Sequence, residues 1–198
     1  YDATAQKIIV ACNDGEGIVV AGSVSGTSIS FDTPFTFDSS SVSNTGAAYD
    51  ANAQKVVIAY TDGGNSNYGT GVVYQPAANL TNLTSENYIG MSGGAIEVDS
   101  DTQVIGSPTV FESASSVEIG SAYDANAQRV VVAYRDGGNS NYGTAVVGTV
   151  SGTSISFGTP VVFLSAVARE SSVVYDANAQ KVVIAYKNDG NNESTAIV

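Results

Sequence analysis

Histidine and tryptophan are absent from this chain of 198 residues, and cysteine and methionine occur once each. Without histidine, the chain lacks the commonest general base and the commonest transition-metal ligand. A single cysteine, Cys12, excludes an internal disulfide, and we expect it to be a buried free thiol. The sequence also has no phosphate-binding loop and no serine–histidine–aspartate pattern. These absences predict a protein that is not an enzyme.

Basic residues are scarce as well. Seven Lys and Arg face nineteen Asp and Glu, which leaves a net charge of -12, and only 13% of the residues are charged. A nucleic-acid-binding surface needs Lys and Arg to displace counterions, so we expect no nucleic-acid partner. No apolar run is long enough to cross a bilayer as a helix, so we expect no membrane insertion.

One phrase recurs four times, and its copies mark the organisation of the chain. They read YDATAQKIIVACND from Tyr1, YDANAQKVVIAYTD from Tyr49, YDANAQRVVVAYRD from Tyr123 and YDANAQKVVIAYKND from Tyr175. Such self-similarity indicates stacked or radially arranged units, none of which buries its apolar face alone. We predict one domain over residues 1–198, with units at 1–48, 49–122, 123–174 and 175–198, the last of them incomplete. A repeat supplies the same residue everywhere, which also disfavours a catalytic site.

Each unit reads as antiparallel strands. Runs of Val, Ile, Tyr and Phe are bounded by Gly, Asn, Asp and Ser, and no stretch has the periodicity of an amphipathic helix. In the third unit we expect a short segment ending at the tyrosine, then QRVVVAYRD, TAVVGTV and SISFGTPVVF, with a Ser-rich loop after them. Pro34, Pro108 and Pro160 share one place in the fourth strand, where proline favours a sheet edge. Four strands per repeat predict a β-propeller or propeller-like array of four units, open or completed by another segment.

The turns and the first strands support this architecture. Asp–Ala–Asn–Ala–Gln after each tyrosine predicts a hairpin in which Asp or Asn caps the turn or adopts a left-handed conformation. Small residues before Tyr49 and its equivalents suit strands that crowd around an axis, and a sandwich or solenoid is the alternative. Tyr60, Tyr134 and Tyr186 are expected to pack in the core or between units.

The two ends and one insertion differ from the regular pattern. The first unit lacks most of its first strand, the fourth stops within its third, and the chain begins at Tyr1 without a signal-like segment, as a processed piece of a longer protein would. Because open sheet edges aggregate unless they are paired, we predict self-association or a docked protein partner at both ends. Residues 74–96 are an insertion in the second unit, and insertions in repeats often form binding loops.

The runs KVVIAYTDGGNSNYGTGVV and RVVVAYRDGGNSNYGTAVVGTVSGTSISFGTPVVF resemble repeats in large proteins of marine phages, marine bacteria and sponge-type invertebrates. The segment NLTSENYIGMSGG resembles a piece found beside those repeats, so the resemblance covers nearly the whole chain. It implies propeller-like β-repeats on the outside of particles, cells or matrices, and it brings no catalytic residues. The first unit departs from the pattern, because CNDGEGIVV lacks the GNSNYGT loop.

The loop after the second strand of a unit is the best candidate for a metal site. Asp62, Asn65 and Asn67 recur as Asp136, Asn139 and Asn141 in Gly-bearing loops. Calcium binds six to eight oxygens from carboxylates, amides and carbonyls, so these loops suggest a weak Ca²⁺ site. Each loop has only one carboxylate, however, and a β-turn stabilised by Asn and Gly is the alternative interpretation. The aspartates that follow the repeated tyrosines, Asp2, Asp50, Asp124 and Asp176, are expected to cap their turns.

Tyrosine beside asparagine and serine suits contact with glycans or proteins. We therefore predict ligand-binding roles for Tyr68, Tyr74, Tyr88 and Tyr142, together with Asn65, Asn67, Asn139 and Asn141. Glu86, Glu97, Asp99 and Asp101 are the acids that a glycan-active enzyme would use, since glycoside hydrolysis needs two unique carboxylates.

The sequence thus favours a non-enzymatic extracellular structural or interaction module that self-associates or docks a partner protein, with a mineral-associated scaffold as one form of it. A glycan-binding adhesin-like module of a phage fibre or cell surface is the alternative, and a glycan-active enzyme is the third reading.

Overall fold

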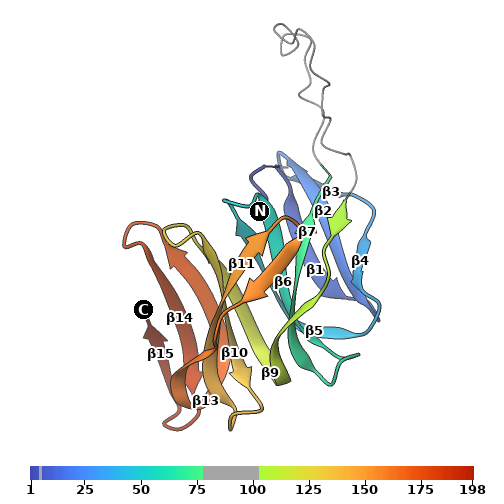
Figure 1. Ribbon diagram of the computed structural model, residues 1–198. Coiled ribbons are helices and arrows are strands. Elements are labelled where there is room, and N and C mark those ends of the chain that lie inside the picture. The colour runs from blue at the N-terminus through green and yellow to red at the C-terminus, as the bar shows by residue number, and fades with distance from the viewer. Residues whose placement is uncertain (5, 78–102) are drawn as a thin grey trace, which may run out of the picture.

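The computed structural model describes residues 1–4, 6–77 and 103–198, and the described elements are all strands (Figure 1). Their bounds are β1 Ile8–Asn13, β2 Gly17–Ser25, β3 Ser28–Phe31, β4 Phe35–Asp38, β5 Val42–Asp50, β6 Lys55–Asp62, β7 Tyr68–Gln75, β8 Val104–Ile105, β9 Thr109–Asp124, β10 Arg129–Asp136, β11 Tyr142–Ser151, β12 Ser154–Phe157, β13 Val161–Asp176, β14 Lys181–Asn188 and β15 Glu193–Ile197. The prediction of an all-β protein is confirmed.

The strands form two antiparallel sheets. Strands β1 to β4 make a four-stranded sheet, and the other strands make an eleven-stranded sheet with the order β15-β14-β13-β11-β10-β9-β7-β6-β5, to which β12 and β8 are added at β11 and β7. The long strands β9 and β13 change partners halfway. Residues 109–115 pair with β7 and residues 116–124 pair with β10, while β13 divides in the same way between β11 and β14.

This change of partners divides the structure into four units that lie next to one another in chain order (Figure 1). Unit one is β1 to β4. Unit two is β5 to β8 with the first half of β9, and unit three is the second half of β9, β10 to β12 and the first half of β13. Unit four is the second half of β13 with β14 and β15.

The predicted fourth strand of the third unit, SISFGTPVVF, is two strands rather than one. Strands β12 and β13 both pair with β11, and the chain between them leaves the ladder. Pro160 has no backbone N–H to donate, so the second strand begins only at Val161. Pro34 and Pro108 stand at the same place, directly before β4 and β9.

The Ser-rich segment before the third and fourth phrases is strand, although the sequence predicted a loop. Strands β9 and β13 run through it for 16 residues each and bend at a bulge. The bulge residues Asn44, Glu118 and Glu170 have positive φ angles of 48°, 57° and 52°. Strand propensity is low for serine, so cross-strand pairing on both sides of the bulge, and not local preference, holds the Ser-rich segment in strands.

The hairpin turns follow the prediction closely. The carboxylate Oδ1 of Asp50 accepts the backbone N–H groups of Asn52 and Ala53 at 3.0 and 2.9 Å, and Asp124 and Asp176 repeat this cap. The left-handed residue is the glutamine that ends the turn, with φ of 55° in Gln54, and not the expected Asp or Asn. Gly26 adopts the positive φ that its Ser–Gly–Thr turn requires.

The core is divided among three junctions between units, because each sheet has two apolar faces. In unit two, Ile58 and Tyr60 pack against Val19 and Phe37 of unit one. The neighbouring residues point the other way, and Val57, Ala59 and Val73 pack against Val130, Val132 and Tyr134 of unit three. A third cluster joins Ala133 of unit three to Val173, Ile184 and Tyr186 of unit four.

One aromatic pair recurs at every junction. Phe37, Phe111 and Phe163, from the outer strand of one unit, lie against Tyr60, Tyr134 and Tyr186 of the next unit, with ring centroids 5.1 Å apart in each case. The three tyrosines are therefore junction residues, as predicted. A glycine on the neighbouring strand makes room for each phenylalanine, since a Cβ added at Gly69 would lie 2.4 Å from the ring of Phe111.

Hydrogen bonds continue across the same junctions. The hydroxyl of Tyr60 donates to Asp38 Oδ2 at 2.9 Å, and that of Tyr134 donates to Glu112 Oε2 at 3.2 Å. At the third junction the residue that follows Phe163 is Leu164, which offers no acceptor.

The bulge residues form a second series of cross-unit bonds. Glu118 N–H donates to Asn44 Oδ1 at 3.2 Å, and Glu170 N–H donates to Glu118 Oε2 at 3.1 Å. Small residues nearby let the strands approach, because a Cβ added at Gly46 would lie 3.3 Å from the backbone nitrogen of Ser121.

The phenol hydrogen bond gives a matched test of the junctions. Tyr134→Phe removes the bond to Glu112 and leaves a desolvated carboxylate, so we expect the free energy of unfolding to fall by about 1.5 kcal/mol. Tyr186→Phe should change it little, because Leu164 accepts no bond. Urea unfolding of both variants measures the difference, and an equal loss in the two would contradict this account of the junctions.

Candidate interaction surfaces

The loops predicted to bind calcium are closed turns. Asp62 Oδ1 accepts the backbone N–H groups of Gly64 and Asn65 at 2.9 and 3.1 Å, and Asp136 Oδ1 accepts those of Gly138 and Asn139 at 2.8 and 3.1 Å. The carbonyl of Asn65 accepts the N–H of Tyr68 at 2.9 Å, and Asn139 and Tyr142 repeat this bond. Asn67 and Asn141 have positive φ angles. The β-turn interpretation accounts for each of these residues.

The paired glycines of these loops are required by packing. Gly63 N–H donates to the carbonyl of Ser41 at 2.9 Å, and a Cβ on this glycine would lie 2.5 Å from the same oxygen. Gly137 makes the equivalent contact with Ser115. The Gly–Gly pair therefore lets the loop fit beneath the segment that enters the inner strand of its unit.

Each of these loops has one further carboxylate close to its aspartate, Asp38 near Asp62 and Glu112 near Asp136. Burial, and then the charge of Asp38, raise the pKa of Asp62. Among residues 1–4, 6–77 and 103–198, no three His, Cys, Asp or Glu side chains gather closely enough to hold a metal ion. The calcium site stays a hypothesis, and the caps on Asp50, Asp124 and Asp176 agree with the turn role expected for the repeated aspartates.

Tyr74, one of the tyrosines predicted to bind a ligand, is not on the surface. Its side chain is completely buried in the junction between units one and two, and its hydroxyl donates to Gln103 Oε1 at 3.0 Å. Burial, followed by the charges of Asp32 and Asp2, raises the pKa of this phenol to about 12. Tyr74 precedes the insertion in the sequence, but it belongs to β7 and its side chain points inward.

The other predicted ligand residues have mixed positions. Tyr68 and Tyr142 are half-buried at the starts of β7 and β11, where their loops end. Tyr88 lies outside the described residues, as do Glu86, Glu97, Asp99, Asp101 and most of the insertion 74–96.

The tyrosines that open the phrases also cross between units. The hydroxyls of Tyr49 and Thr4 are 2.7 Å apart, and the Tyr123 hydroxyl accepts the N–H of Asn52 at 3.1 Å. Each of these tyrosines therefore reaches the hairpin turn of the preceding unit. The repeated phrase supplies contacts between units at both of its tyrosines.

Unit one presents an uncovered apolar surface, the head face, on the side that points away from unit two. Strands β1 and β2 turn Ile9, Ala11 and Val19 toward unit two, so the alternate residues point outward. These outward residues are Ile8, Val10, Cys12, Ile18 and Val20, which define the head face. Val10 is 40% exposed, and Cys12 is half-buried rather than buried as predicted.

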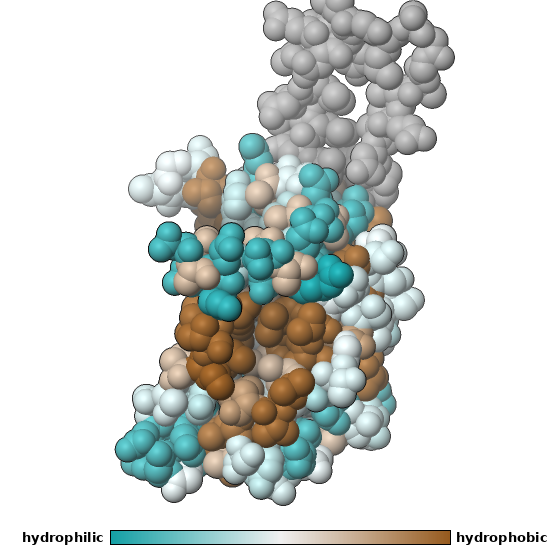
Figure 2. Space-filling model, turned by 60° about the vertical axis from the view of Figure 1, so that its left-hand side comes forward, coloured by the Kyte–Doolittle hydropathy of each residue, from teal (hydrophilic) through white to brown (hydrophobic). Residues whose placement is uncertain are grey.

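Unit four presents the opposite surface, the tail face. Val173, Ile184 and Tyr186 pack toward unit three, so the alternate residues Val174, Val183, Ala185 and Ala196 point away from it and define the tail face. Val174 is 56% exposed. Figure 2 brings forward the side on which β14 and β15 lie and shows apolar residues gathered there below a band of polar ones.

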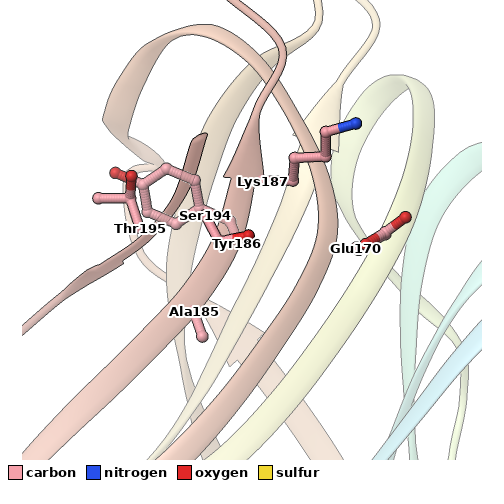
Figure 3. A pocket seen from close by; sticks show the side chains of 6 residues that line it. All are labelled: Glu170, Ala185, Tyr186, Lys187, Ser194 and Thr195. Atoms are coloured by element: carbon pink, nitrogen blue, oxygen red, sulfur yellow. The ribbon is translucent and has the colours of Figure 1, made fainter. Parts of the chain in front are cut away.

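A hollow of about 180 Å³ opens in unit four (Figure 3). It is lined by Glu170, Ala185, Tyr186, Lys187, Ser194 and Thr195.

Nothing in the sequence distinguishes the residues of the head and tail faces from buried residues, because both occupy the same phrase positions. Their place in the first and last units is the only signal.

The edges of the end units are open within the described part of the chain. There, β1 has a ladder only with β2, and β15 only with β14.

None of the described residues belongs to a helix that is long and apolar enough to cross a membrane. No protein-family model, curated protein or solved structure matches this chain.

The loop carboxylate distinguishes a turn from a metal site. Asp136→Ala removes two hydrogen bonds from a buried cap, so we expect a loss of about 1 kcal/mol in the free energy of unfolding. Asp136→Asn keeps an acceptor at the same place and should stay near the parent protein.

Thermal unfolding of both variants, with calcium and with a chelator, makes the comparison. If calcium stabilises the parent chain, and Asp136→Asn abolishes that effect as completely as Asp136→Ala does, the loop is a metal site and the turn interpretation fails.

Proposed function

We propose that this chain is a non-enzymatic structural or interaction module that acts outside the cell or on a particle surface. Its units form part of a propeller-like β-array, and its two ends dock protein. The observation that carries the proposal is that both ends expose the apolar phrase positions that the internal junctions bury.

In units one and four the outer sheet face is apolar, and Val10 and Val174 are exposed on it. Inside this chain such a face packs against a neighbouring unit. An exposed apolar face together with an unpaired strand edge is a typical site for protein docking. In the described parts of the chain, these exposed apolar residues thus form surfaces suited to packing against protein.

The other roles considered have less support. The Asn-bearing loops are engaged in their own turn hydrogen bonds, and Tyr74 is buried. Of the tyrosines expected to read a glycan, Tyr74 therefore serves the fold, and the loop asparagines contribute backbone groups to their turns.

Adding an inner strand before β1 tests whether the edge of unit one accepts another strand. Residues 109–122 form the long strand that enters unit three, and a copy of them fused before Tyr1 would pair with β1. We expect the melting temperature to rise by roughly 2–4 °C for each kcal/mol that the added strand contributes.

The matched control is the same extension with proline at the positions copied from Gly120 and Ser121, which interrupts the ladder. If both extensions give the same melting temperature and the same amide exchange in β1, the edge does not accept a strand and the proposal fails.

A further inference from the structure

We propose that acid strengthens the first two junctions between units, because each of them brings together two carboxyl groups, one from each unit. The pair at the first junction is Asp38 and Asp62, and the pair at the second is Glu112 and Asp136. A proton taken up by either member removes the repulsion within its pair, so a fall in pH should tighten these junctions and a rise should loosen them. The inference is independent of the proposed docking function.

The first pair is assembled by the packing of a loop of unit two beneath the end of β4. Asp38 Oδ1 accepts the N–H of Ser40 at 2.8 Å, and a Cβ added at Gly64 would collide with the hydroxyl of Ser40. The N–H of Gly64 in turn donates to Asp62 Oδ1 at 2.9 Å. Both carboxylates also act on one phenol. Burial, followed by the hydrogen bond to Asp38 and the charges of Asp38 and Asp62, raises the pKa of Tyr60.

The second pair is assembled in the same way between units two and three. A Cβ added at Gly138 would lie 2.6 Å from the Cβ of Ala114, which follows two residues after Glu112. Gly138 N–H donates to Oδ1 of the buried Asp136 at 2.8 Å. Burial, followed by the charges of Glu112 and Asp136, raises the pKa of Tyr134, whose hydroxyl donates to Glu112. One phenol bond leaves two like charges in each pair.

Among the described residues, which include all seven basic side chains, none forms an ion pair with these four carboxylates. Lys55 and Arg129 begin β6 and β10, whereas Asp62 and Asp136 end those strands. Arg135 directly precedes Asp136, so the two side chains point to opposite faces of β10. The ion pairs of the described chain join Lys7 to Asp32, and Arg169 and Lys187 to Asp189.

The titration of both pairs is displaced in the same direction. Burial, and then the charge of Asp38, raise the pKa of Asp62, while burial, and then the charge of Asp136, raise the pKa of Glu112. A carboxyl group whose pKa is raised by folding binds its proton more tightly in the folded chain than in the unfolded one. The free energy of unfolding therefore increases as the pH falls through the raised pKa toward the ordinary carboxyl range near about 4.

The third junction has lost both members of the pair. Leu164 stands at the place of Glu112, and Asn188 stands at the place of Asp136. Asn188 Oδ1 still accepts the N–H of Gly190 at 2.9 Å, so the turn is capped without a charge. The turn alone thus does not require an aspartate in the first two loops. At the three junctions the two carboxylates occur together or not at all, which indicates that they act as a pair.

Urea unfolding of the 198-residue chain between about pH 7.5 and about pH 5 tests the proposal. We expect the urea midpoint of the parent chain to rise as the pH falls. Glu112→Gln and Asp62→Asn keep a hydrogen-bond acceptor and remove one charge from one pair each. Each variant should therefore have a midpoint at or above that of the parent near pH 7.5 and a smaller rise on acidification, and the double variant should have the smallest rise.

The matched control separates the pairs from the general repulsion of a chain whose net charge is -12. Asp14→Ser removes one carboxylate from the exposed turn after β1, so it changes the net charge as much as the other variants do. It should keep the pH dependence of the parent chain.

A parent midpoint that is constant or falls on acidification would overturn the proposal, as would variants of the pairs whose rise equals that of Asp14→Ser. Nuclear magnetic resonance titration of the carboxyl carbons in the parent chain gives a reading that does not depend on any variant folding. Asp62 and Glu112 should titrate above the ordinary range of their residue types, and titration within or below that range would equally overturn it.

Discussion

Contact between a tyrosine of one unit and a phenylalanine of the unit before it sets how successive sheets pack. The three pairs have the same centroid separation of 5.1 Å, and in each the phenylalanine covers a glycine of its own unit. The constraint behind this contact is that every sheet has two apolar faces, so a unit gains stability from each neighbour that covers a face. Units two and three have a neighbour on both sides, and units one and four have one neighbour among the described residues.

The repeated phrase gains a physical meaning from these contacts. Its first tyrosine reaches the preceding hairpin, as Tyr123 does at Asn52, and its aspartate caps its own turn, as Asp50 does. Its second tyrosine joins the preceding unit, and the Gly–Gly pair fits the loop beneath its neighbour. Most of what the phrase preserves is packing between units, which leaves few of its residues for binding a ligand.

Much of this arrangement could be predicted from the sequence. Local chemistry is sufficient for the strands, the capped hairpins and the positive φ of Gly26, because each depends on residues near in the chain. The junction role of Tyr60 could be predicted from the repetition of its phrase. Long-range pairing decided the rest. Glu118 lies inside a strand because β10 pairs with the residues on both sides of it, and Tyr74 faces inward because alternate side chains of β7 point to opposite faces. Local composition reveals neither. The head and tail faces could not be read at all, because burial depends on whether a neighbouring unit follows.

If the junctions between units stabilise the fold, the protection of a unit's backbone amides from exchange should increase with the number of its sheet faces that a neighbouring unit covers. Native-state amide hydrogen exchange of the monomeric chain measures this strand by strand. The account predicts that amides of β6, β7, β10 and β11, in the two units covered on both sides, exchange slowest and only through global unfolding. Amides of β1 and β15 should exchange through smaller openings. Equal protection in all four units, or the greatest protection in units one and four, would contradict it.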